Sequence, residues 1–184
     1  MKRSLIGIAI MALLFTVFVL NNHKQLPTKD DVLKITEGYI PAIEKVYLVE
    51  KLDDEWITLY RNNKTIMVAR LVQNWLGYWE IKDELGNENS LATSDYLPVR
   101  DTELIYSASS KANTTAYYFG QIINPNIKKI EVETQKNVFK EAHIISDGKT
   151  QFFYAKAEGE IFMPVNIKGF SELGIMNYSS VKKY

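Results

Sequence analysis

The side chains best suited to acid–base or metal chemistry are scarce in this chain of 184 residues, which has two histidines. His23 follows a long apolar run, and His143 lies inside Ala142-His143-Ile144-Ile145, a segment typical of a β-strand. A zinc site or a catalytic dyad needs partners close to the imidazole. No such partner is visible near His143, so we expect a solvent-facing or hydrogen-bonded strand residue there. The sequence predicts no catalytic residue, no metal site and no cofactor.

Carboxylates form two clusters, Asp53-Asp54-Glu55 and Asp83-Glu84 with Glu88. Two carboxylates that face each other across a cleft are the machinery of glycosidases. Both clusters fall in predicted turns, where acidic side chains are usually solvated. The sequence favours this solvated arrangement, and a hydrolase that acts on sugar or peptide through carboxylates remains the alternative.

The nucleophilic residues and the net charge exclude further classes of function. The chain has no cysteine, which rules out disulfides, zinc–thiolate sites and a thiol nucleophile, and no serine lies in a Gly-x-Ser-x-Gly motif. Its 22 basic and 22 acidic residues balance, and the remainder of the chain carries about −2 once Lys2 and Arg3 are set aside. No basic footprint for nucleic acid is present.

Aromatic residues are the strongest candidates for binding. A strand predicted over 76–82 extends back to Trp75, so that Trp75, Gly77 and Trp79 share one face while Leu76 and Tyr78 share the other. Tyr117-Tyr118-Phe119 likewise has aromatic rings on both faces. One face of each must be core, and the other is either covered by a second sheet or free to bind peptide or sugar. We favour covered faces, with Trp79 in the core, and take Tyr78 and Tyr117 as the possible binding surface.

The element that places these residues in a compartment is the apolar segment 4–21, which has no charged residue from Ser4 to Leu20. A helix of this length spans roughly 25 Å at about 1.5 Å per residue, close to the ~30 Å hydrocarbon core of a bilayer. Lys2 and Arg3 favour a cytoplasmic N-terminus and a C-terminal domain outside. A cleaved signal is the alternative, but no small residues mark a cleavage position near 16–22. The segment therefore predicts a single-pass signal anchor in the cell membrane.

The rest of the chain predicts one short helix and many strands. After a linker over 22–27, Thr28 and Asp31 form a capping box for a helix that ends near Gly38. Alternating patterns and turn residues such as Asn62-Asn63-Lys64, Asn124-Pro125-Asn126 and Asp147-Gly148 then predict an antiparallel meander and a sandwich-like region. The expected strands are 46–52, 55–61, 65–72, 76–82, 103–107, 116–123, 127–133, 139–146, 151–156 and 161–167.

Domain organisation follows from these patterns. Residues 1–3 form a cytoplasmic tip, 28–90 a helix with a β-meander, and 91–184 a sandwich-like region. Residues 88–102 are rich in Ser, Thr and Asp and mark the best candidate boundary. The sequence leaves open whether the two regions form one domain or two.

A short stretch carries a resemblance to known proteins. Tyr118-Phe119-Gly120-Gln121-Ile122, followed by Ile127-Lys128-Lys129-Ile130-Glu131-Val132, resembles a segment of small exported or membrane-anchored proteins from spore-forming Gram-positive bacteria. Those proteins have no known activity, so the resemblance implies a compartment and a β fold without site residues. The sequence as a whole predicts a membrane-anchored β domain outside the cytoplasm that binds a protein or an envelope glycan.

Overall fold

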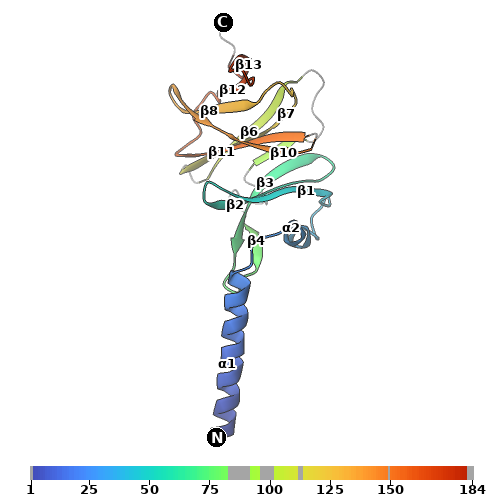
Figure 1. Ribbon diagram of the computed structural model, residues 1–184, viewed down its shortest axis with the longest axis vertical. Helices are drawn as coiled ribbons and strands as arrows, with labels where there is room; N and C mark the ends of the chain where they lie inside the picture. Colours follow the sequence, from blue (N-terminus) through green and yellow to red (C-terminus); the bar gives the residue numbers. More distant parts are fainter. Residues whose placement is uncertain (1, 83–91, 96–101, 112–113, 149, 182–184) are drawn as a thin grey trace.

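The computed structural model describes the backbone of residues 2–82, 92–95, 102–111, 114–148 and 150–181. It is mostly β, as predicted, with helix α1 (Lys2–His23) at one end and the last strand near the other (Figure 1). The predicted capping box is confirmed in helix α2 (Lys29–Ile35), where Thr28 and Asp31 satisfy each other's backbone N–H groups. The short second helix therefore begins where the sequence placed it.

The strands nearest α1 form sheet A, in the order β1-β2-β3-β4 with β5 also paired to β3. Their bounds are β1 (Lys45–Leu52), β2 (Glu55–Arg61), β3 (Thr65–Gln73), β4 (Trp79–Lys82) and β5 (Ala92–Asp95). All pairs are antiparallel. Short turns make these pairings local: Asp53 and Asp54 join β1 to β2, and Asn62 accepts three hydrogen bonds from Lys64 and Thr65 before β3.

Two further antiparallel sheets complete the fold. Sheet B has the order β10-β11-β7-β6, and sheet C the order β13-β12-β8-β9. The strands of sheet B are β6 (Leu104–Lys111), β7 (Thr115–Ile122), β10 (His143–Asp147) and β11 (Thr150–Glu158). Those of sheet C are β8 (Lys129–Gln135), β9 (Val138–Glu141), β12 (Ile167–Phe170) and β13 (Met176–Ser179).

Sheet B lies between sheets A and C, because each of its faces contributes to a separate core. One face places Phe119 and Phe152 against Ile57 and Leu59 of sheet A. The other places Tyr118 and Phe153 against residues of sheet C such as Ile130. A strand that is covered on both sides must be apolar on both sides, which explains the aromatic runs in β7 and β11. The predicted regions 28–90 and 91–184 thus both contribute residues to the core between sheets A and B.

The outer face of sheet A carries a smaller apolar cluster. Val32 of α2 is fully buried there against Val46, Tyr60 and Leu71. Trp56 and Trp79 extend this cluster, with ring centroids 6.0 Å apart in an edge-on arrangement. The prediction that Trp79 packs with the core is therefore confirmed, although the residue is only partly buried.

Several predicted boundaries require correction. The predicted strand 76–82 begins only at Trp79, and the predicted strand 139–146 is divided at Ala142 into β9 of sheet C and β10 of sheet B. The strand expected over 161–167 begins at Ile167 instead. The sequence predicts neither β5 nor β13, because each strand is only four residues long. The acidic loop 83–89 and most of the expected boundary 88–102 lie outside the described residues.

Candidate functional site

The two residues proposed as a binding surface occupy different environments. Tyr117 lies in β7 and is 1% exposed, with its ring in the core between sheets A and B. Its burial raises the pKa of the phenol, and the negative charge of Glu55 raises it further. The ring is not accessible to a partner, so the prediction for Tyr117 is wrong: the second sheet covers it. Tyr78 is 50% exposed, and its role in binding stays a prediction.

The segment around Tyr78 is a turn, not the strand that alternation predicted. Asn74 N–H donates to the Tyr78 carbonyl, Gly77 N–H donates to the Asn74 carbonyl, and the Asn74 side chain accepts from Leu76 N–H and Tyr78 N–H. Gly77 has φ +83, a left-handed conformation that favours glycine. The expectation that Trp75 shares a strand face with Trp79 is therefore wrong. We call residues 74–78 the Trp75 turn.

The Trp75 turn packs against the end of α1. A Cβ atom on Gly77 would lie 2.7 Å from Asn22 Cβ and 2.8 Å from His23 N, so only glycine allows this approach. Two ring pairs extend the contact along the helix: Phe15 with Trp75 and Phe18 with Tyr78, each with centroids 6.3 Å apart. Figure 1 shows this hairpin end of β3 and β4 meeting the last turn of α1.

Polar side chains close the same junction. Gln73 Nε2 donates to the carbonyl oxygens of Asn22 and Gly77, at 3.1 Å each, and Asn22 Nδ2 donates to the Leu76 carbonyl at 3.2 Å. Trp79 Nε1 donates to the Gln25 carbonyl at 3.2 Å. The contacts join residues far apart in the sequence and fix the direction in which α1 leaves the β domain.

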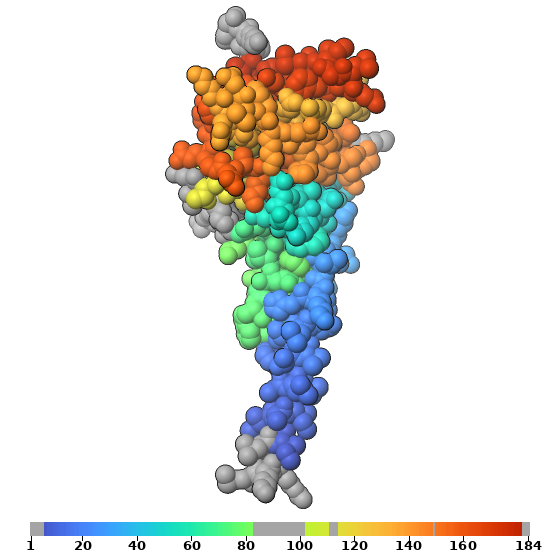
Figure 2. All heavy atoms as spheres, turned by 60° about the vertical axis from the view of Figure 1, so that its left-hand side comes forward, coloured from blue at the N-terminus to red at the C-terminus, as the bar shows by residue number. Residues whose placement is uncertain are grey.

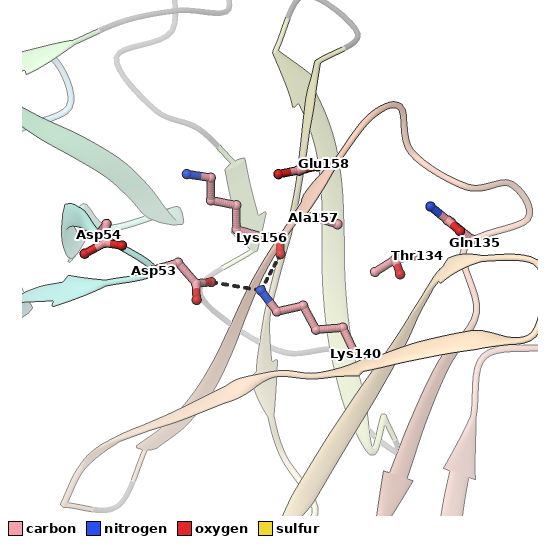
Figure 3. Close-up of a pocket in the computed structure, with 8 residues that line it drawn as sticks. All are labelled: Asp53, Asp54, Thr134, Gln135, Lys140, Lys156, Ala157 and Glu158. Atoms are coloured by element: carbon pink, nitrogen blue, oxygen red, sulfur yellow. Dashed lines mark hydrogen bonds and ion pairs between the residues drawn. The ribbon is translucent and has the colours of Figure 1, made fainter.

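A second candidate site is a charged pocket of about 390 Å³ on the side of the β domain. Figure 3 shows Asp53, from the β1–β2 turn, pointing toward Lys140 of β9, whose amine also reaches the Lys156 carbonyl of β11. Asp53 Oδ2 lies 3.2 Å from Lys140 Nζ, and Asp53 Oδ1 lies 3.4 Å from His143 Nε2. Asp53 therefore connects one turn of sheet A to a strand of sheet B and a strand of sheet C.

The charges of this region are largely paired with one another. Burial works to raise the pKa of Asp53, but hydrogen bonds and positive charge from Lys140 and His143 outweigh it and lower the pKa. Next to it, Glu55 Oε1 lies 3.2 Å from Arg70 and 3.1 Å from Lys156. Groups held in ion pairs of this kind cross-link the sheets. A glycosidase pair, by contrast, needs carboxylates that face a substrate.

His143 stands at the start of β10 as a partly exposed strand residue hydrogen-bonded to Asp53. This is the bonded strand residue that the sequence led us to expect, with a partner that the sequence did not reveal. Within the ranges that the structure describes, no group of three or more histidine or carboxylate side chains is placed to hold a metal ion. The second acidic cluster, Asp83, Glu84 and Glu88, lies outside those ranges.

We expect Asp53→Asn to destabilise the β domain slightly at neutral pH. Asn keeps the left-handed backbone at this position, so only the charge is lost. Because the pKa of Asp53 is lowered in the folded state, its contribution is present above the unfolded pKa of about 3.9 and is lost as pH falls through the folded value. Urea unfolding should show a loss of up to about 1 kcal/mol at pH 7 that is smaller at pH 3.

Asp54→Asn is the matched control, because the Asp54 side chain is 99% exposed in the same turn. Its effect should be near zero at both pH values. Equal losses for Asp53→Asn and Asp54→Asn would show that the contacts to Lys140 and His143 contribute nothing.

No family model matches this chain, and the searches of curated proteins and of solved structures find no significant match. The resemblance of residues 118–132 to exported proteins of Gram-positive bacteria thus stays a prediction.

Proposed function

We propose that this chain is a single-pass, membrane-anchored β domain outside the cytoplasm that binds a protein or an envelope component through the surface farthest from α1. The observation that supports the anchor is α1 itself. Its span Ile6–His23 is long and apolar enough to cross a membrane, and none of its residues is fully buried, although its outer end contacts the Trp75 turn. Apolar side chains exposed on every side of a helix need a lipid environment.

A cleaved signal sequence passes the same test of length and composition, and the junction with the β domain favours an anchor over it. Asn22 and His23 belong to the last turn of α1 and contact Gly77. Cleavage between the apolar run and the domain would remove the helix end against which Gly77 packs. A chain that keeps α1 retains all of these contacts.

The surface proposed to bind a partner lies at the opposite end of the molecule, on sheet C. Figure 2 shows the red β12–β13 region and the orange β8–β9 region at the end away from the blue helix. We call it the distal surface, defined by the exposed apolar residues Leu173, Ile175 and Met176 in the β12–β13 turn and at the start of β13. Leu173 is 85% exposed. Apolar side chains gathered at one end of a domain are typical of an interaction surface.

A pocket of about 570 Å³ adjoins the distal surface at Met176 and adds a concave region that is lined by both apolar and polar side chains. Phe139 and Met176 line it together with Glu133, Asn166 and Lys168. Lys168 Nζ lies 3.5 Å from the centroid of the Phe139 ring, a cation–π contact. An apolar patch with a few fixed polar groups suits a protein or glycan ligand. No observation on the described residues specifically favours the alternative of a carboxylate hydrolase, since Asp53 and Glu55 are ion-paired.

Site-specific photo-crosslinking in intact cells tests this proposal. A photoreactive amino acid at Leu173 or Ile175 should form a discrete adduct with an envelope protein or glycan. The same amino acid at Leu33, which is 42% exposed on α2 beside sheet A, is the control and should not form it. Adducts that are identical at the three positions, or absent from all of them, would contradict binding through the distal surface.

A further inference from the structure

We propose that the Trp75 turn is a membrane-insertion element that places Trp75 and Tyr78 in the same lipid leaflet as the outer end of α1. The inference rests on the membrane anchor proposed above and adds a second point of contact with the bilayer. The β domain then sits directly on the membrane surface, held by both α1 and the β3–β4 hairpin.

The depth of the turn follows from the residues of α1 that it touches. Trp75 packs on Phe15 and Tyr78 on Phe18, and both phenylalanines lie inside the uncharged run from Ser4 to Leu20. At about 1.5 Å per residue, Phe15 lies roughly 8 Å inside the end of that run. A lipid chain that covers Phe15 therefore also reaches the Trp75 ring, which is 72% exposed. Trp and Tyr are enriched at membrane–water interfaces, so both rings suit a turn that enters the bilayer from its surface.

The carbonyl groups of the turn have polar partners within the protein, as a medium without water requires. Asn74 and Tyr78 carbonyls accept from backbone N–H groups, and Leu76 and Gly77 carbonyls accept from the side chains of Asn22 and Gln73. The remaining carbonyl, of Trp75, lies 3.3 Å from His23 Nε2. Unsatisfied backbone groups are what normally keep loops out of the hydrocarbon region. Here all five carbonyl groups of the turn have a polar contact within the protein.

The absence of charged residues around the turn also supports its insertion into the membrane. No charged residue occurs between Arg70 and Glu80, so nine consecutive positions can approach lipid without burying a charge. Leu26, 68% exposed beside the junction, adds a further apolar side chain at this end of the β domain. Lipid is the occupant that fits, because the turn is continuous with a helix surface that itself needs lipid.

Fluorescence quenching by brominated lipids tests the proposal on the full chain. The wild type, Trp75→Phe and Trp56→Phe are reconstituted into phosphatidylcholine vesicles with and without bromine on the acyl chains. The intensity difference between wild type and Trp75→Phe reports Trp75, and most of it should be lost in brominated vesicles. The corresponding difference for Trp56→Phe should change little, because Trp56 packs on Trp79 in the β domain.

Flotation of the vesicles separates this proposal from the anchor. Protein that fails to float with the vesicles contradicts the anchor itself. Protein that floats, but whose Trp75 is quenched by aqueous acrylamide and not by brominated lipid, overturns membrane insertion of the turn. Shielding of Trp75 from both quenchers would also overturn it and would identify a protein surface as the occupant.

Discussion

Phe152→Ala is expected to unfold a large part of the molecule. Phe152 is fully buried between sheets A and B, stacked on Phe119 with ring centroids 6.2 Å apart and 4.9 Å from the ring of Tyr47. Removing the ring leaves a cavity at the contact that joins the two sheets, at a cost of about 3–5 kcal/mol. A domain of this size has only about 5–15 kcal/mol in total. Urea unfolding of the full chain in detergent micelles measures the loss.

Phe139→Ala is the matched control for this prediction. Phe139 is only partly buried, on sheet C beside the pocket of the distal surface. The same chemical change should therefore cost much less stability there. Similar losses for the two variants would mean that sheets A and B do not share the core described above.

Gly77→Ala is expected to separate α1 from the Trp75 turn while the stacked sheets stay folded. The change forces a side chain into a left-handed backbone, at about 1–2 kcal/mol, and drives its Cβ to 2.7 Å from Asn22 Cβ. With about 1–3 kcal/mol for the displaced backbone, the local cost is about 2–5 kcal/mol. Hydrogen exchange of the amides in residues 20–28 and 73–79 should become about 30- to 5,000-fold faster, with the amides of sheet B unchanged.

Two glycines separate the causes of this effect. Gly174 has φ +77 but open space where a methyl group would lie, so Gly174→Ala carries the backbone strain alone. Gly38 has neither a positive φ nor a neighbour within 4 Å of that position, so Gly38→Ala should be neutral. If Gly77→Ala and Gly174→Ala have equal local effects, the end of α1 does not pack on the turn.

The parts of the fold that the sequence predicted correctly are those set by nearby residues. The capping box of Thr28 and Asp31 depends on a spacing of three residues, and the turn at Asn62 depends on one side chain that accepts from the N–H groups of Lys64 and Thr65. The turn between β10 and β11 follows from Asp147-Gly148. Each signal is complete within a few positions, so no knowledge of the rest of the chain is needed.

The Trp75 turn shows how a local pattern can mislead. Alternation of large residues around Gly77 matched a strand, yet the Asn74 side chain and the left-handed Gly77 close a turn. Asn at the first and Gly at the fourth position of a turn is itself a recognised signal. That signal was present in the sequence and was outweighed by the aromatic pattern. The contact with α1 then explains why large apolar residues occupy a turn.

The remaining differences come from contacts between distant segments. The sequence predicts a possible surface at Tyr117 because a strand with aromatic residues on both faces does not reveal whether a second sheet covers one of them. In the structure, sheet A covers the face that carries Tyr117. Asp53 meets Lys140 and His143 from the far half of the chain, and no spacing rule brings these residues together. A short strand such as β5 forms because it pairs with β3. Its own residues carry no strand pattern from which this pairing could be predicted.

The intact mass of the membrane-bound protein tests the central claim most directly. The chain is expressed in a bacterial host with an active signal peptidase, the membranes are washed with alkaline carbonate, and the mass of the extracted protein is measured. We predict that the protein stays in the washed membranes at the full mass of 21.2 kDa, because the end of α1 packs on Gly77. A shorter protein that lacks the segment up to about residue 22 and is released in soluble form would contradict the account.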